Sequence, residues 1–346
     1  MPPKSKPKKD QVLKRPAQAQ AKKRPAAKSV ASQAQYVLVS SYTEKHGHVF
    51  SPRINEAKGI TVFQRTPGTA DEFGSLTPVW SCTDFPSPTY MCANRARTRI
   101  YTVSEVGSDA TVSAYAFDAS SGKMKLLNSV ETGGAVACHV SLSRNERILA
   151  VANYMGSVGL FRLQADGRLV ERTFLQEHER LGVGVNRERQ EGPHPHMALF
   201  DAQSKHVLVP DLGLDRVVVY GTDVAGRLKA KSHLALPPGS GPRHMAFHPG
   251  GRLAYVLNEL LSTVVPCHWD AKTTSLTAIG EPRDGRFVYV SNRGHCSITV
   301  FRVLEDGLLE RSSSAFTGPG VCDEEREVAW PPRDCPRDFD SSGGLF

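Results

Sequence analysis

The chain has 346 residues, of which 40% are hydrophobic, and its formal net charge is +8 at pH 7. This composition allows a large buried core, and no hydrophobic run approaches the roughly 20 residues that span a bilayer, so we expect a soluble protein with no membrane segment. Residues 1–30 hold ten Lys or Arg and one Asp, which leaves the rest of the chain at −1. The folded body is therefore not expected to bind nucleic acid.

The basic N-terminal segment, residues 1–34, is rich in Lys, Pro, Ala and Gln and has too few apolar residues to offset the entropy of ordering it. We predict a disordered tail. It lacks the apolar stretch of a secretory signal. The sequence KRPAQAQAKKRPAAK has two interpretations, a nuclear address or a solubilising tail. A cytoplasmic monomer is the default expectation, and the tail introduces the nucleus as an alternative location.

The seven cysteines are scattered along the chain and form no CxxC pair. An odd, unpatterned count in a chain of this size predicts reduced thiols and neither a disulfide framework nor a zinc site.

The body of the chain, residues 35–346, is built from repeats. Six segments share a pattern in which an apolar strand ends at a polar residue, and they are YVLVSSY, YTVSEVG, LAVANYMG, VLVPDLG, AYVLNEL and VYVSNRG. A second apolar run follows each segment, and the aligned valines recur every 34 to 64 residues. Short strands at this spacing are typical of a β-propeller with four-stranded blades.

First strands precede this pattern over 90–94, 139–143, 196–200 and 244–247, and we predict recognisable blades from residue 86 to 265. Between Glu259 and Arg293 only EPRDGRFVYV represents the next blade, whose innermost strand is missing before Asp284. The last blade is truncated at CPRDFDSSGGLF. We therefore expect missing strands and imperfect closure of the ring.

The densest cluster of candidate site residues lies in the segment 241–265. Arg243 and His244 open an apolar run, His-Pro-Gly-Gly follows at 248–251, and a second run ends at Asn258 and Glu259. Turn residues between two alternating runs predict a β-hairpin. Because a hairpin brings the start of its first strand beside the end of its second, Arg243, His244 and Glu259 should share one rim.

Comparison of equivalent positions in the repeats distinguishes candidate site residues from structural ones, because a residue type that occurs in a single copy is free to serve catalysis. His139, His196 and His244 recur in three blades, so each could be a structural histidine that bonds a neighbouring backbone. The position after the polar strand end is occupied, in order, by Tyr42, Val106, Tyr154, Leu212, Glu259 and Arg293. Only the last two are charged. Arg243 is also unique, since it aligns with Cys138 and Pro195.

Other chemistries have little support in the sequence. His194-Pro195-His196 and His46-Gly47-His48 could present two rings on one face of a strand, but no matched third ligand accompanies them, so no metal is expected. The chain has no G-x-S-x-G elbow, no phosphate-binding loop and no dinucleotide fingerprint. We therefore expect neither covalent serine catalysis nor a nucleotide cofactor.

Three segments, GPHPHMALFDAQSKHVLVPDLGLDRVVVY, GSGPRHMAFHPGGRLAYVLNELLSTV and DGRFVYVSNRGHCSITVF, resemble the seven-bladed propeller lactonase family. That family contains bacterial-type 6-phosphogluconolactonases and fungal carboxymuconate lactonizing enzymes. The resemblance covers roughly residues 36–310 and implies a seven-bladed β-propeller that hydrolyses a phosphorylated sugar lactone.

The resemblance also implies a set of site residues. His196, Arg243, Glu259 and Arg293 would be catalytic. His196 would act as the base, Arg243 would face the developing oxyanion, and Glu259 would orient the base or hold sugar hydroxyls. Arg293, with Arg216, would anchor the substrate anion. His194 and His244 complete the expected substrate-binding set.

Each assignment has an alternative. Glu259 and Arg293 could form a salt bridge at the rim that contributes only ~0–1 kcal/mol if exposed. Arg216 could be a solvated arginine at a strand end. The whole chain could instead be a lactonizing cycloisomerase, whose dicarboxylate substrate would use the same arginines, or a catalytically impaired propeller that serves as an interaction module.

Overall fold

The computed structural model describes residues 34–43, 57–68, 74–223, 227–279, 287–292, 297–303 and 309–316. Every regular secondary-structure element in these ranges is a β-strand, which confirms the all-β prediction. Residues 34–346 form one compact unit. No helix long and apolar enough to cross a membrane occurs in the described ranges. The basic tail lies outside them, so its disorder and its role as an address remain predictions.

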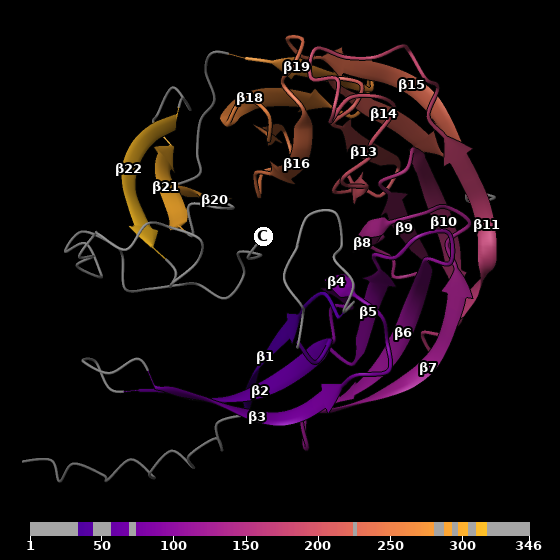
Figure 1. The fold of residues 1–346 in the computed structure, drawn as a ribbon, viewed down its shortest axis with the longest axis vertical. Coiled ribbons are helices and arrows are strands. Elements are labelled where there is room, and N and C mark those ends of the chain that lie inside the picture. The colour runs from indigo at the N-terminus through magenta and orange to yellow at the C-terminus, as the bar shows by residue number, and fades with distance from the viewer. Residues whose placement is uncertain are drawn as a thin grey trace, which may run out of the picture. The chain divides into compact units, whose positions relative to one another are not determined.

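The strands form six sheets (Figure 1). In chain order they are β1 (Gln35–Ser40), β2 (Ile60–Thr66), β3 (Ser75–Cys82), β4 (Pro88–Ala93), β5 (Arg99–Ser104), β6 (Thr111–Asp118), β7 (Lys123–Glu131), β8 (Ala137–Leu142), β9 (Ile148–Asn153), β10 (Ser157–Leu163), β11 (Leu169–Glu177), β12 (Leu199–Phe200), β13 (His206–Asp211), β14 (Arg216–Thr222), β15 (Leu228–Ala235), β16 (Pro242–Phe247), β17 (Leu253–Asn258), β18 (Thr263–Asp270), β19 (Ser275–Ala278), β20 (Phe287–Asn292), β21 (Ser297–Val303) and β22 (Leu309–Phe316).

Every sheet is an antiparallel meander of consecutive strands, the pattern of a propeller blade. Four sheets have four strands each, β4–β7, β8–β11, β12–β15 and β16–β19, and they confirm the blades predicted between residues 86 and 265. Within the described residues, the first and last sheets, β1–β3 and β20–β22, have three strands each. Closure of the ring depends on residues outside the described ranges and remains a prediction.

The hairpin predicted in segment 241–265 is confirmed. β16 pairs with β17 from Pro242↔Asn258 to Phe247↔Ala254, and the N–H of Gly251 donates to the carbonyl of His248 at 2.8 Å to close the turn. The pairing places the start of β16 beside the end of β17, where the candidate site residues lie.

The first strand of the fourth sheet is shorter than the sequence predicts. Pairing over 196–200 is confined to Leu199–Phe200, with an isolated bridge between Pro195 and Asp211. Pro195 has no N–H to donate to a ladder. The N–H of His196 still donates to the carbonyl of Pro210, at 3.0 Å. The N–H of Ala198 donates instead to Nδ1 of His139, at 3.3 Å, and that of His194 to the carboxylate of Asp211, at 2.7 Å. Side chains thus replace part of the strand pairing.

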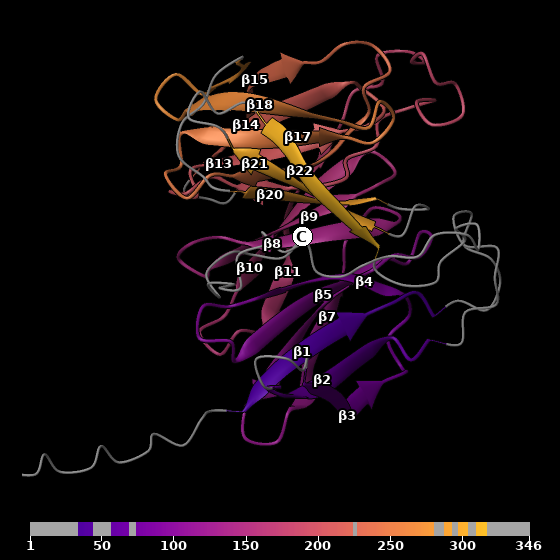
Figure 2. The ribbon, with the colours of Figure 1, turned by 90° about the vertical axis from the view of Figure 1, so that its left-hand side faces the viewer.

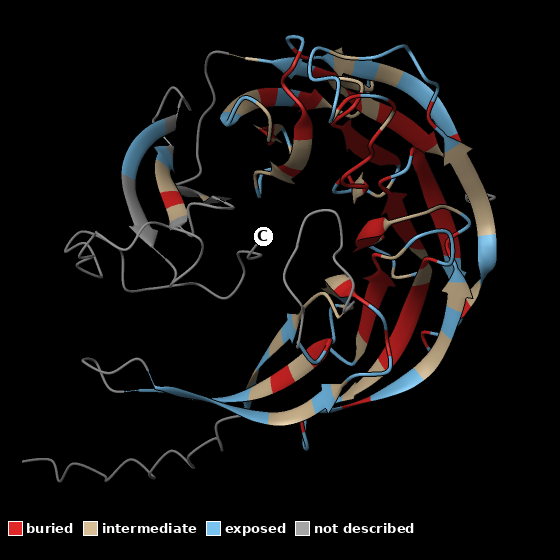
Figure 3. Cartoon of the chain, in the orientation of Figure 1, coloured by how far each residue is buried: buried red, intermediate tan, exposed pale blue. Residues whose placement is uncertain are grey.

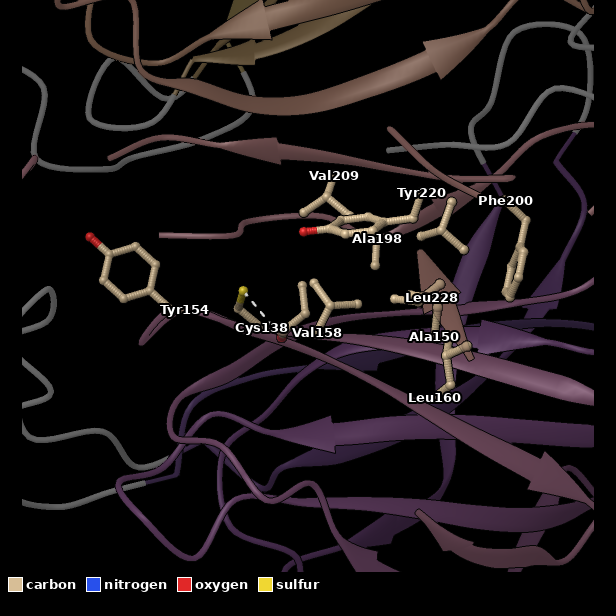
Figure 4. Close-up of a cluster of buried hydrophobic side chains, with 12 residues drawn as sticks. Cys138, Ala150, Tyr154, Val158, Leu160, Ala198, Phe200, Val209, Tyr220 and Leu228 are labelled. Carbon is tan, nitrogen blue, oxygen red and sulfur yellow. Dashed lines mark hydrogen bonds between the residues drawn. The ribbon is translucent and has the colours of Figure 1, made fainter. Parts of the chain in front are cut away.

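Hydrophobic clusters fill the space between the first five successive sheets. Val103 of the second sheet and Val151 of the third, both fully buried, belong to one such cluster. Figure 4 shows the next one, where Val158 and Leu160 pack with Val209. Burial of one such side chain contributes about 1.5–3 kcal/mol, so stacking of the sheets is the main source of stability. The strands on the outer side, such as β7 and β11, are largely exposed or half-buried (Figure 3). Figure 2 shows the view turned by 90°, with β1, β2 and β3 at one end and β14, β15 and β18 at the other.

The four described cysteines are free thiols, as the sequence predicts, and they are Cys82, Cys92, Cys138 and Cys267.

Candidate active site

The β16–β17 hairpin presents Arg243 and Glu259 at the same end. The ladder register shifts between Pro242 and His244, so Arg243 is the extra residue of a β-bulge. A bulge turns a side chain away from its regular direction. Across the hairpin, the N–H of Glu259 donates to the carbonyl of Gly241 at 2.8 Å, which holds Glu259 beside the bulge.

One nitrogen of Arg243 contacts two other predicted site residues. Nη1 lies 3.0 Å from Nε2 of His196 and 2.5 Å from Oε2 of Glu259. The side chains of Arg243 and Glu259 are 25% and 22% exposed, so the ion pair is accessible from solvent but partly desolvated. Because a guanidinium only donates, Nε2 of His196 accepts, and the ring proton is on Nδ1. The structure therefore brings His196 together with Arg243 and Glu259, two of the residues that the hairpin predicts on one rim.

His196 is held in its neutral form. Burial lowers its pKa well below the usual 6.5, and the positive charge of Arg243 adds to the effect. A neutral imidazole has an unprotonated Nε2, which can accept a proton from water once Arg243 no longer donates to it.

The neighbouring imidazoles are also buried. Burial, with a further contribution from Arg243, lowers the pKa of His244 to about 4, and its ring centroid lies 6.4 Å from that of His196. His139 accepts a hydrogen bond from the N–H of Ala198 through Nδ1, at 3.3 Å. His139 thus contacts a neighbouring backbone, which is the structural role considered for the repeated histidines.

His194 lies beside the cluster with both ring nitrogens engaged. Nδ1 is 3.0 Å from the carbonyl oxygen of Tyr154, and Nε2 is 2.9 Å from Oε1 of Glu191. The ring also stacks on Tyr154, with centroids 4.1 Å apart and planes 9° apart. Its role in substrate binding stays a prediction, whereas the structure shows its contacts with Tyr154 and Glu191 directly.

Arg189 contributes to the site and was not predicted from the sequence. Its Nη2 lies 3.0 Å from Oε1 of Glu259, on the oxygen that Arg243 does not contact. Burial acts to raise the pKa of Glu259, but Arg243 and Arg189 outweigh it, so the pKa is lowered and the carboxylate is ionised at neutral pH. The charged run RERQE at 187–191, just before the His-Pro-His motif, is the only signal of this contact in the sequence.

The two remaining arginines have different outcomes. Arg216 opens β14 opposite Asp211 and is half-buried. Among the described residues, it makes no hydrogen bond or ion pair with His196, Arg243 or Glu259. Arg293 lies outside the described residues, and so does any ion pair between it and Glu259.

The repeated polar strand ends belong to the scaffold. Asn153 and Asn258 are buried, and each donates its side-chain amide to a hydroxyl at the start of the next strand, at 3.0 Å. Asp211, also buried, accepts from the N–H groups of His194 and Leu214. These contacts fix the turns from which the unique side chains project. Within the described ranges, no three His, Cys, Asp or Glu side chains are grouped as a metal site requires.

Comparisons with known proteins agree with the fold. The family model described as lactonase, seven-bladed β-propeller, matches residues 36–282 and 274–319. The 6-phosphogluconolactonase of Bacillus subtilis is 35% identical over 237 residues, which are 63% of this chain and 67% of the relative. A Bacteroides fragilis protein provisionally assigned as a 6-phosphogluconolactonase aligns with a TM-score of 0.72 and 28% identity over 84% of both chains. The periplasmic gluconolactonase of Pseudomonas aeruginosa aligns with a TM-score of 0.67 and 25% identity over 82% of this chain and 83% of its own.

Proposed function

Because this chain belongs to the seven-bladed β-propeller lactonase family, we propose that it hydrolyses 6-phospho-D-glucono-1,5-lactone to 6-phosphogluconate. The observation that carries the proposal is the double contact of Arg243, whose Nη1 meets both His196 and Glu259. It combines a neutral base, a cation and a carboxylate in one partly buried site. The Bacillus subtilis relative, which is named for this activity, supports the choice of substrate.

His196 is the proposed general base. In the absence of substrate its Nε2 accepts from Arg243. As the substrate enters, the guanidinium turns toward the lactone carbonyl and leaves Nε2 to accept a proton from water. Glu259 remains bound to Arg243 through Oε2 and so limits the movement of the guanidinium.

The chemical steps follow from these positions. Water adds to the carbonyl carbon as His196 accepts one of its protons, and the carbonyl oxygen becomes an oxyanion beside Arg243. Collapse of this tetrahedral intermediate breaks the ring C–O bond, and the imidazolium returns the proton to the leaving oxygen. One water is consumed, and the carboxylic acid that forms loses its proton to solvent, so the products are a carboxylate, a free hydroxyl group and one proton. An oxyanion donor of this kind contributes about 10²–10³ in rate, and a general base about 10²–10⁴.

Arg293 and Arg216 remain candidates to anchor the phosphate, and a charge-assisted contact of this type contributes about 1.5–3 kcal/mol. His194 and His244 remain proposed neighbours of the substrate. The ring stacking between His194 and Tyr154 would hold one wall of the site in place.

The test is release of 6-phosphogluconate from the lactone, measured with a coupled dehydrogenase after subtraction of the uncatalysed rate. His196→Gln and Arg243→Met should each lower kcat at least about 100-fold. His233→Gln is the matched control, because His233 is exposed on β15. Full activity in either site variant would refute the assigned roles, and no activity in the wild-type protein would refute the function.

A further inference from the structure

The long connection between β11 and β12 brings a second guanidinium into the site. Arg189 contacts Oε1 of Glu259 at 3.0 Å through Nη2, while Arg243 contacts Oε2. Two guanidinium groups thus flank one carboxylate, and His196 beside them is neutral because burial lowers its pKa. One positive charge in this group is not compensated by Glu259. A site with excess positive charge favours an anionic ligand.

The connection is built to hold this arginine in place. The next residue, Gln190, is fully buried, and its amide donates to the carbonyl of Leu212 at 2.9 Å. Its Oε1 accepts from the N–H of Asn186 at 3.0 Å, and its own N–H donates to the carbonyl of Asn186 at 2.7 Å. A surface loop that is held by a fully buried polar side chain has a defined conformation. The backbone of Arg189 is therefore fixed beside the site.

The two arginines occupy opposite ends of the carboxylate. Arg243 contacts His196 and therefore stands at the end where the carbonyl reacts. Arg189 contacts the other oxygen of Glu259. In 6-phosphoglucono-1,5-lactone the phosphate is joined to the carbonyl carbon through the ring oxygen, C5, C6 and the ester oxygen, so it lies several atoms away from the reacting carbon. An oxyanion and a phosphate separated in this way need two separate cations, and Arg243 and Arg189 supply them.

We propose that Arg189 is a specificity-determining residue that binds the anionic group of the substrate and makes the enzyme prefer phosphorylated lactones over neutral ones. This inference rests on the proposed function. A guanidinium has five N–H donors in a planar fork, so Arg189 can contact Glu259 and Tyr154 and still donate to a phosphate oxygen. The side chain is 27% exposed, which leaves it accessible to a ligand.

The test compares Arg189→Gln with the wild-type protein on 6-phosphogluconolactone and on glucono-1,5-lactone. We expect the KM for the phosphorylated lactone to rise about 10- to 150-fold, because one charge-assisted contact is lost, with little change for the neutral lactone. Arg187→Gln is the matched control. It removes the same charge from the same loop, where Arg187 is exposed, and it should change neither KM.

Equal loss of kcat on both lactones would show that Arg189 only positions Glu259, and it would overturn the proposal. An unchanged KM in Arg189→Gln would do the same. Calorimetric titration with 6-phosphogluconate and with gluconate separates this result from failure of the proposed function. If the wild-type protein hydrolyses neither lactone but binds 6-phosphogluconate through Arg189, the function fails and the anion site stands. If 6-phosphogluconate binds the wild-type protein and Arg189→Gln equally, or binds neither, the anion site fails.

Discussion

Acidification should destabilise the folded protein through its buried histidines, and His244 allows the size of the effect to be worked out. Burial, with the positive charge of Arg243, lowers the pKa of His244 from 6.5 to about 4, although Glu259 acts in the opposite direction. In the unfolded chain the ring regains its ordinary pKa. As the pH falls, the unfolded state therefore takes up the proton first, and the free energy of unfolding decreases.

The magnitude follows from the two pKa values. With about 4 in the folded state and 6.5 in the unfolded state, protonation of His244 lowers the free energy of unfolding by about 2 kcal/mol at pH 5 relative to pH 8. The loss begins as the pH falls through about 6.5 and is complete below about 4. Burial also lowers the pKa of His139 and of His196, so both add to the loss in the same direction.

The measurement is urea unfolding at pH 8 and at pH 5 for the wild-type protein and for His244→Gln. Removal of the titrating ring should reduce the difference between the two pH values by about 2 kcal/mol. Any loss in the free energy of unfolding that the substitution causes equally at both pH values cancels in this comparison. His233→Gln, at an exposed position on β15, should leave the pH dependence unchanged. The same pH dependence in His244→Gln and in the wild-type protein would refute the reasoning.

Three further predictions concern the site and the core. The acidic limb of kcat/KM should lie below pH 6.5, because burial and Arg243 lower the pKa of the base His196; initial rates against pH measure it, and a limb above 6.5 would contradict it. Gly241→Ala should lower the free energy of unfolding by about 1–3 kcal/mol, because Gly241 has a φ of 58° and a Cβ there would overlap Leu260. It should also lower activity, because Leu260 is next to Glu259. An added methyl at Gly107 meets no atom within 4 Å, so Gly107→Ala is its control in thermal unfolding. Leu160→Ala, at a fully buried position, should cost about 2–5 kcal/mol in urea unfolding, and a loss below 1 would contradict the packing between the third and fourth sheets.

The repeat pattern predicted the fold because a propeller blade is a local structure. Each blade consists of consecutive hairpins, so turn residues such as those at 248–251 and the alternation on either side determine it without distant contacts. The exception is β12, which the sequence extends to His196 and the structure confines to Leu199–Phe200. There a distant side chain, the imidazole of His139 on the neighbouring blade, accepts the hydrogen bond from the backbone N–H of Ala198. Alternation within one segment cannot reveal such a competitor.

The candidate site was predictable where it lies on the repeats and not elsewhere. Arg243 and Glu259 stand at equivalent positions of a repeated unit, so each could be compared with other copies and recognised as unique. Arg189 lies in the connection from 178 to 198, which has no counterpart in the other blades. Its place opposite Glu259 depends on contacts that Gln190 makes with Leu212 and Asn186. These are side-chain contacts between irregular segments, and no periodic pattern records them.

The structure also explains why comparison of the repeats selected Arg243. Three first strands have a β-bulge at the same register position, occupied by Thr89, Cys138 and Arg243. The same backbone feature thus presents a hydroxyl, a thiol and a guanidinium in three blades. The thiol of Cys138 donates to the carbonyl of Pro195 at 3.5 Å and to that of His196 at 3.7 Å, so it supports the backbone of the base, while Arg243 contacts the imidazole of the same residue. Because His196 lies between two of these bulges, one on each neighbouring blade, its ring and its backbone are fixed from opposite sides by positions that are equivalent in the repeat.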